Sequence, residues 1–211
     1  NKLKRTKLAK VATTVLTIPG ERLCFDLTGV MNEGKSLGYF LLVVCEATSY
    51  KWSFFLKSKS DLPVAMLGLV SLLRGHGYPI SFLRCDDAGE NRSFKKLADD
   101  AELGIHFEFT APDTPQQNVL CERSIATIRA RAASMMSAAQ FDVSIKNRLW
   151  KECYNCSREL DNILVMENWD SSPAKAFWNQ LLPYALSLCT FGEVGLVKQH
   201  ENCLLYTSPS P

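Results

Sequence analysis

Three acidic residues stand where their carboxylates could act together in one reaction. Asp26 interrupts an apolar run at residues 23–27, Asp86 directly follows the run at 82–85, and Glu122 lies early in a predicted helix. A carboxylate within a sheet costs roughly a few kcal/mol of desolvation unless it is paired or binds a cation. Carboxylate oxygens suit octahedral Mg²⁺ or Mn²⁺. Two such ions about 4 Å apart would activate the attacking oxygen and stabilise the leaving oxygen in phosphoryl transfer.

The spacing of these residues strengthens the metal hypothesis. Asp26 and Asp86 are 60 positions apart, and 35 residues separate Asp86 from Glu122. If the strands that carry the aspartates are neighbours in a sheet, their side chains can project side by side. Simpler interpretations exist for each residue alone: a strand aspartate can lie on a solvated face or pair with Arg22 or Arg84, and a helix glutamate is usually exposed.

The elements that must position these residues alternate between strands and helices. Short breaks between the first three predicted strands indicate an antiparallel meander, and the later alternation indicates a mixed sheet flanked by helices. We expect Asp61 to cap the first helix, with Pro63 in its first turn. The predicted strands are 22–30, 38–47, 51–57, 80–85 and 105–110, and the predicted helices are 61–75, 93–103, 117–140 and 145–164.

Two ordered sequence blocks carry a family resemblance. Residues 83–91 (LRCDDAGEN) resemble the block R-x-D-N-[GA]-G-E, and residues 114–123 (TPQQNVLCER) resemble T-P-Q-Q-N-G-x-x-E-R. Both blocks are typical of integrase cores of copia-type LTR retrotransposons, in the retroviral integrase superfamily. Shorter matches at residues 19–23, 52–59, 160–162 and 190–193 extend the resemblance over roughly residues 19–197.

This resemblance implies a fold, a reaction and partners. The fold would be α/β and RNase H-like, with a five-stranded mixed sheet in the order 3-2-1-4-5. Asp26, Asp86 and Glu122 would form a D,D-35-E triad that holds two Mg²⁺ or Mn²⁺ ions. The reaction would be 3′-end processing and strand transfer of element DNA ends into target DNA. The family works as multimers beside other polyprotein domains, zinc-binding and reverse transcriptase among them, in the nucleus or in cytoplasmic virus-like particles.

Three residues depart from the family pattern. Asp87 replaces the usual Asn, Val119 the usual Gly, and Asp113 stands where Gly is common. Val and Asp allow less backbone freedom than Gly, and the two aspartates add negative charge where a phosphate backbone would pass. Two alternatives therefore stay open: a catalytically impaired nucleic-acid-binding remnant, and another RNase H-like nuclease that acts on RNA–DNA hybrids.

The helices after Glu122 form a basic segment. Residues 123–151 carry six basic residues and one acidic residue, a net charge of +5. Glu122 and Arg129 are seven positions apart and so share a helix face. A solvated helix face would explain the charge, but beside a triad we favour phosphate contact for Arg123 and Arg129. Gln117 and Asn118 could hydrogen-bond phosphate or bases.

Composition sets the remaining limits. The chain is 46% hydrophobic and 22% charged, as in a folded globular protein, and no apolar run approaches the roughly 20 residues of a membrane helix. The eight cysteines are interpreted as reduced thiols. Cys153 and Cys156 form the one close pair, and it has no second pair and no suitably spaced histidine, so a zinc site is improbable. The net charge of +2 conceals +5 in residues 1–10 and −3 in the rest.

Four segments are predicted along the chain, which resembles a fragment of a longer polyprotein. Residues 1–20 form a basic lead-in, and residues 21–164 form the integrase catalytic core. Residues 165–202 extend the core with a short helix at 172–178 and a last strand at 191–197. Residues 203–211 do not match the chemistry of the preceding sequence and are interpreted as a non-native tail.

Overall fold

A computed structural model describes residues 17–32, 35–110, 118–139, 141–165, 169–180, 183 and 191–192. In these residues five strands form one sheet in the order β3-β2-β1-β4-β5, which confirms the predicted order. β1 pairs antiparallel with β2 and parallel with β4, so the sheet is mixed. The strands are β1 (Arg22–Asn32), β2 (Lys35–Cys45), β3 (Lys51–Leu56), β4 (Phe82–Asp86) and β5 (His106–Thr110).

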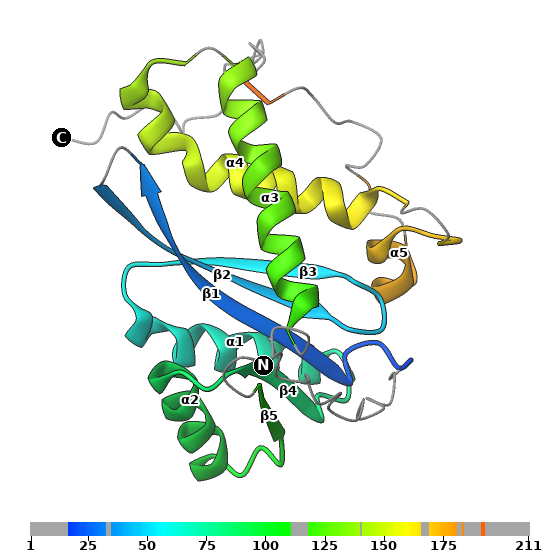
Figure 1. Ribbon diagram of the computed structural model, residues 1–211. Helices are drawn as coiled ribbons and strands as arrows, with labels where there is room; N and C mark the ends of the chain where they lie inside the picture. Colours follow the sequence, from blue (N-terminus) through cyan, green and yellow to red (C-terminus); the bar gives the residue numbers. More distant parts are fainter. Residues whose placement is uncertain are drawn as a thin grey trace, which may run out of the picture.

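Helices cover both faces of the sheet (Figure 1). α1 and α2 pack on one face, whereas α3 and α4 pack on the other. The short α5 lies beside the β3 end of the sheet and buries Ala174 and Phe177 in the core on the α1 side. The helical elements are η1 (Lys59–Asp61), α1 (Leu62–Gly75), α2 (Gly89–Asp100), α3 (Val119–Ala138), α4 (Val143–Ile163) and α5 (Pro173–Trp178).

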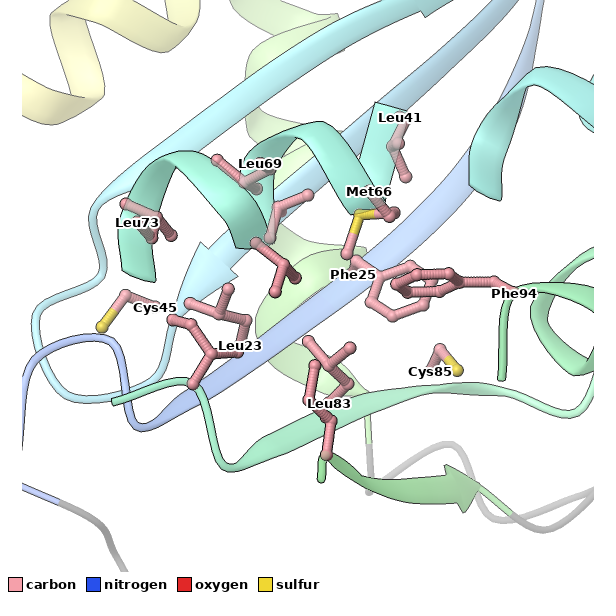
Figure 2. Close-up of a cluster of buried hydrophobic side chains, with 14 of the residues drawn as sticks. Leu23, Phe25, Leu41, Cys45, Met66, Leu69, Leu73, Leu83, Cys85 and Phe94 are labelled. Atoms are coloured by element: carbon pink, nitrogen blue, oxygen red, sulfur yellow. The ribbon is translucent and has the colours of Figure 1, made fainter. Parts of the chain in front are cut away.

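Alternation along β1 divides the core into two layers. Leu23 and Phe25 point toward α1 and α2, where they meet Met66 and Phe94 (Figure 2). Cys24 points the other way and packs with residues of α3 and α4. Successive strand side chains face opposite sides of a sheet, so Asp26 belongs to the same face as Cys24. The fold therefore directs Asp26 toward the α3 side.

One predicted boundary differs by more than three residues. α2 begins at Gly89, four residues before the predicted start at Ser93. Ala88 is extended, and its carbonyl accepts hydrogen bonds from the backbone N–H groups of Asn91 and Arg92, which closes the first turn early. Glu90 then lies in that turn, where the positive end of the helix dipole favours a carboxylate.

Of the two predicted helix-capping residues, Ser172 caps its helix and Asp61 does not. The Asp61 carboxylate accepts hydrogen bonds from the backbone N–H groups of Lys57 and Ser58, so it closes the turn around η1 and makes no side-chain cap bond to α1. The short helix at 172–178 is confirmed as α5, because the Ser172 hydroxyl caps it by accepting from the Lys175 N–H.

The described residues bear on the cysteines, on membrane helices and on the C-terminal segment. The six cysteines within the described residues are free, and five of them are buried. No helix in the described part of the chain is long and apolar enough to cross a membrane. Phe191 and Gly192 form a turn; the rest of the predicted strand at 191–197, the lead-in at 1–16 and the tail at 203–211 lie outside the described residues.

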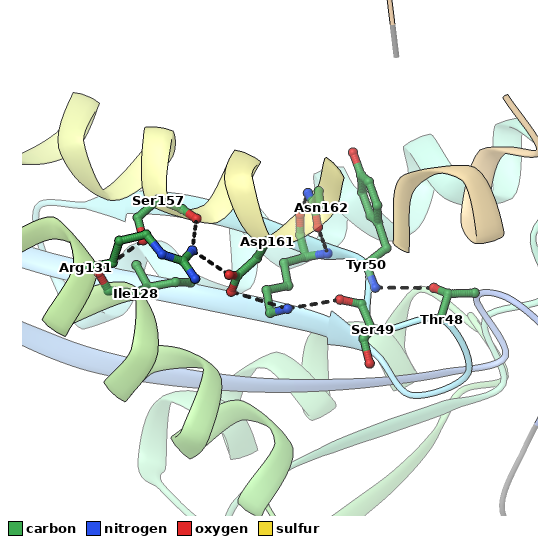
Figure 3. Close-up of polar contacts among 9 residues, drawn as sticks. Thr48, Ser49, Tyr50, Ile128, Arg131, Ser157, Asp161 and Asn162 are labelled. Carbon is green, nitrogen blue, oxygen red and sulfur yellow. Dashed lines mark hydrogen bonds and ion pairs between the residues drawn. The ribbon is translucent and has the colours of Figure 1, made fainter. Parts of the chain in front are cut away.

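Asn162 of α4 links this helix to the edge strand β3 through hydrogen bonds to the Lys51 backbone (Figure 3). Its fully buried amide accepts from the Lys51 N–H and donates to the Lys51 carbonyl, each at 2.9 Å. We expect Asn162→Ala to lower the free energy of unfolding by about 2–4 kcal/mol, because it leaves two buried backbone groups without partners. Urea denaturation measures this. The matched control Asn155→Ala removes one bond from a half-buried amide; an equal cost for both variants would contradict the prediction.

Candidate active site

The register between β1 and β4 brings the two aspartates to matching positions. Leu23 pairs with Leu83 and Cys24 with Arg84, so parallel partners are 60 residues apart. The same offset, two residues beyond the last paired position, sets Asp26 opposite Asp86. Neighbouring strands lie about 4.8 Å apart, and residues at matching positions share a face. The register thus directs both carboxylates to the α3 face from neighbouring strands, and the negative charge of Asp86 acts on Asp26.

The N-terminus of α3 is fixed beside Asp26. The Asn118 amide donates to the Phe25 carbonyl at 3.3 Å, and the Asn118 carbonyl accepts from the Glu122 N–H at 3.2 Å. Cys121 is fully buried against the sheet in the same layer as Cys24. Glu122 itself is exposed in the first turn of α3. These contacts place the first turn of α3, which carries Glu122, beside Phe25 and Asp26 in the first half of β1.

The three carboxylates act on one another electrostatically. The pKa of Asp26 is raised, first because burial disfavours its charged form and then because Asp86 and Glu122 are negative. A backbone hydrogen bond from Leu27 opposes this effect. In the absence of a cation, the folded protein therefore disfavours the charged form of the Asp26 carboxylate.

Asn91 of α2 holds the Asp86 side chain. Its Nδ2 donates to Asp86 Oδ1 at 2.5 Å and to the Asp86 carbonyl at 3.1 Å, and Asn91 is buried. Asn91 lies before the helix predicted at 93–103, so the sequence alone does not indicate its role. A buried polar residue in the first turn of an amphipathic helix, five positions after the aspartate, is the signal that could have identified it.

The carboxylates of Asp26, Asp86 and Glu122 are suitable ligands for a hard cation, but as arranged they do not surround a common point. No group of three or more His, Cys, Asp or Glu side chains within the described residues could hold a metal ion as arranged. Carboxylate oxygens are nevertheless the ligands that Mg²⁺ and Mn²⁺ prefer. A cation between Asp26 and Asp86 would also offset the repulsion that raises the pKa of Asp26.

Of the four residues predicted to bind DNA, the three that the structure describes differ in burial and in their place on α3. Gln117 lies outside the described residues. Asn118 is buried and hydrogen-bonds the Phe25 carbonyl, so its contact with DNA stays a prediction. Arg129 is exposed on the same side of α3 as Glu122, and its guanidinium donates to Thr28 Oγ1 at 2.9 Å. Arg123 is also exposed, but it occupies a different stripe of the helix.

The arginines that could have paired with the strand aspartates bind other carboxylates. Arg22 and Arg84 each form ion pairs with Glu46 and Glu108, at 2.6–3.0 Å. This half-buried network connects β1, β4 and β5 with the turn after β2. It explains how the sheet accommodates two strand arginines on the α3 face.

The unusual Asp87 has a partner of its own. Its exposed carboxylate receives two hydrogen bonds from the Arg92 guanidinium, at 2.7 and 2.6 Å. These bonds lower the pKa of Asp87. Asp87 is therefore a charged surface residue whose negative charge is partly offset by Arg92.

Sequence comparison relates the chain to a transposon polyprotein. It is 29% identical over 171 residues to the retrovirus-related Pol polyprotein from transposon TNT 1-94 of Nicotiana tabacum. The match covers 76% of this chain and 12% of the polyprotein, so the chain spans a small part of that relative. No protein-family model matches the chain.

Structural comparison finds the same fold in retroviral proteins. A chain of the simian T-cell lymphotropic virus intasome in complex with PP2A regulatory subunit B56 gamma has a TM-score of 0.61 at 12% identity; the match covers 88% of this chain and 62% of that one. The HTLV-2 integrase catalytic core domain in complex with magnesium, in a trimeric form, has a TM-score of 0.55 at 14% identity, over 76% of this chain and 97% of that one. Identities this low show the RNase H-like fold alone. Together with the transposon relative, they show that this chain carries an integrase-like core.

Proposed function

We propose that the chain is the catalytic core of a copia-type LTR retrotransposon integrase, which joins element DNA ends to target DNA. The observation that supports this proposal is the register of β1 on β4, which directs Asp26 and Asp86 to the same face of the sheet, where the charges of Asp86 and Glu122 both act on Asp26. The transposon relative and the integrase-like fold support it.

The residues of the site have distinct roles in this proposal. Asp26, Asp86 and Glu122 would hold two Mg²⁺ or Mn²⁺ ions, which would supply charge stabilisation for the attacking and leaving oxygens. Asn91 orients the Asp86 carboxylate. Arg129 lies on the Glu122 side of α3 and binds DNA phosphate.

The partners follow from the same proposal. The DNA partners are element ends in 3′-end processing and both element ends and target DNA in strand transfer. One structural neighbour is a trimeric integrase core, and the sequence relative is a polyprotein. We therefore expect a homo-oligomer that acts beside zinc-binding and reverse transcriptase domains.

A strand-transfer assay tests the proposal. The chain is assayed alone and spliced in place of the matched segment of the tobacco polyprotein, with element-end DNA, target DNA and Mg²⁺. A parallel reaction offers an RNA–DNA hybrid. We expect strand-transfer products from the spliced protein and little hybrid cleavage. Hybrid cleavage without strand transfer would instead favour the nuclease alternative.

A catalytically impaired nucleic-acid-binding remnant is the second candidate, because Asp87, Asp113 and Val119 depart from the family pattern and no group of three or more His, Cys, Asp or Glu side chains in the described residues could hold an ion as arranged. It predicts preserved DNA binding with no rise in melting temperature on addition of Mn²⁺. An active copy is expected to bind Mn²⁺ in its folded state and so to melt at a higher temperature. Thermal unfolding with and without Mn²⁺ separates the two.

Asn91→Ala tests the positioning of Asp86. We expect strand transfer to fall about tenfold at low Mg²⁺ and to recover partly at high Mg²⁺, because the freed carboxylate must be ordered by the metal. Activity is measured across a Mg²⁺ titration. The control Arg92→Ala changes the next residue of α2, which binds Asp87 at the surface. Equal Mg²⁺ dependence of the two variants would exclude a positioning role for Asn91.

A further inference from the structure

A cavity lies on the side of α3 away from Glu122. It has a volume of about 600 Å³ and lies between α3, the first residue of β3 and the end of α4. Residues spaced by four, such as Arg123, Thr127 and Arg131, form one stripe of a helix, whereas Glu122 and Arg129 form another. This cavity is therefore separate from the proposed active site.

Two cations share one carboxylate in this cavity. Asp161 of α4 forms ion pairs with Arg131, at 2.5 Å, and with Lys51, at 3.5 Å. Figure 3 shows Arg131 and Asp161 meeting between α3 and α4. Lys51 is 4% exposed, and the Asp161 side chain is 12% exposed. The three side chains together carry a net charge of +1.

The buried positive charge is incompletely compensated. Burial lowers the pKa of Lys51, and the nearby Arg131 lowers it further, although Asp161 opposes both. A charge in a partly desolvated cavity interacts more strongly with a counterion than the same charge in water. The interior of the cavity therefore favours an additional anion.

The wall of the cavity adds polar groups suited to an oxyanion. The exposed Arg123 raises the net side-chain charge to +2. Ser124 and Thr127 contribute hydroxyl groups from α3. An arginine presents a fork of N–H donors that matches phosphate geometry, and hydroxyl groups donate to the remaining oxygens.

We propose that this cavity binds a phosphomonoester group, with Arg123, Arg131 and Lys51 as its cationic contacts. A phosphomonoester carries a charge of about −1.5 to −2 at neutral pH, which matches the +2 of the cavity. A peptide carboxylate or a DNA phosphodiester supplies one negative charge. The volume also lies in the range of small-molecule sites, roughly 300–1,000 Å³, and so leaves room for the group that bears the phosphate.

Calorimetric titration of the chain with inorganic phosphate and with glycerol phosphate tests the proposal. The buffer contains EDTA, so that no metal ion links phosphate to the carboxylates of the active site. We expect saturable one-site binding that Arg123→Gln weakens by at least about tenfold. Lys96→Gln is the matched control, since it removes the same charge from an exposed position on α2. Asp86→Asn is expected to bind like the unchanged chain, which separates this site from catalysis.

The source of the phosphate is distinguished by two oligonucleotides, one with a 5′-phosphate and one with a 5′-hydroxyl. Tighter binding of the phosphorylated strand, lost in Arg123→Gln, assigns the cavity to DNA ends. No difference between the strands, with saturable binding of glycerol phosphate, assigns it to a small phosphorylated molecule. Lys51→Met, which keeps most of the length of the buried side chain but removes its charge, is expected to weaken binding in either case. Absence of saturable phosphate binding, or equal binding by Arg123→Gln and Lys96→Gln, would overturn the proposal.

Discussion

Replacing Asp86 by asparagine is expected to reduce Mg²⁺-dependent strand transfer by at least about 10³-fold, with little loss of stability. The amide keeps the size of the side chain but removes the charged oxygen ligand at the end of β4. Metal stabilisation of the transition state contributes several kcal/mol, and each 1.36 kcal/mol is about tenfold in rate. Asp86 is exposed, so its replacement leaves the core packing unchanged.

Asp87→Asn is the matched control for this experiment. It makes the same chemical change one residue later, where the carboxylate is exposed and paired with Arg92. We expect most of the strand-transfer activity to remain. The assay uses the spliced protein at fixed Mg²⁺, and thermal unfolding of each variant confirms its fold. Equal activity of Asp86→Asn and the unchanged chain would remove Asp86 from the catalytic site.

Asp26→Asn is expected to stabilise the metal-free protein while abolishing its response to metal. The amide removes the desolvated charge that faces Asp86 and Glu122. We expect a gain of about 1 kcal/mol in the free energy of unfolding at pH 7, within the range of single stabilising changes. The same change removes a metal ligand, so Mn²⁺ is expected to raise the melting temperature of the unchanged chain more than that of the variant.

The pH dependence of this effect has a defined sign. The folded-state pKa of Asp26 is raised, so the folded protein binds this proton more tightly than the unfolded chain does. The contribution of Asp26 to stability therefore falls as pH rises from its ordinary pKa through the folded value, and then stays constant. Urea denaturation in EDTA from pH 4 to pH 8 measures it. The advantage of Asp26→Asn should grow with pH; an advantage that shrinks with rising pH would contradict this account.

The strand order and the placement of the aspartates could be predicted because their signals are local or ordered along the chain. The apolar strands have short breaks, and the 60-residue spacing of Asp26 and Asp86 equals the register of β1 on β4. The resemblance to integrase cores supplied the adjacency of these strands, which hydrophobic periodicity alone does not specify. The comparison of structures confirms that fold.

Tertiary contacts explain what could not be predicted. The early start of α2 places Asn91 beneath Asp86, and no local pattern specifies that hydrogen bond. The Asn118 amide donates to the Phe25 carbonyl, 93 residues away in the sequence, and no local pattern specifies this contact either. Lys51 and Asp161 are likewise distant in the chain and meet only when α4 packs on the edge strand. Such pairs are determined by packing rather than by periodicity.

Anomalous diffraction from crystals of the chain grown with Mn²⁺ tests the metal site most directly. We expect a manganese peak between Asp26 and Asp86 at about 2.0–2.2 Å from their carboxylate oxygens, with Glu122 turned toward the same ions. Asp86→Asn crystals, treated identically, should lack that peak. Manganese bound elsewhere at saturating concentration, with these three carboxylates free of metal, would contradict the account.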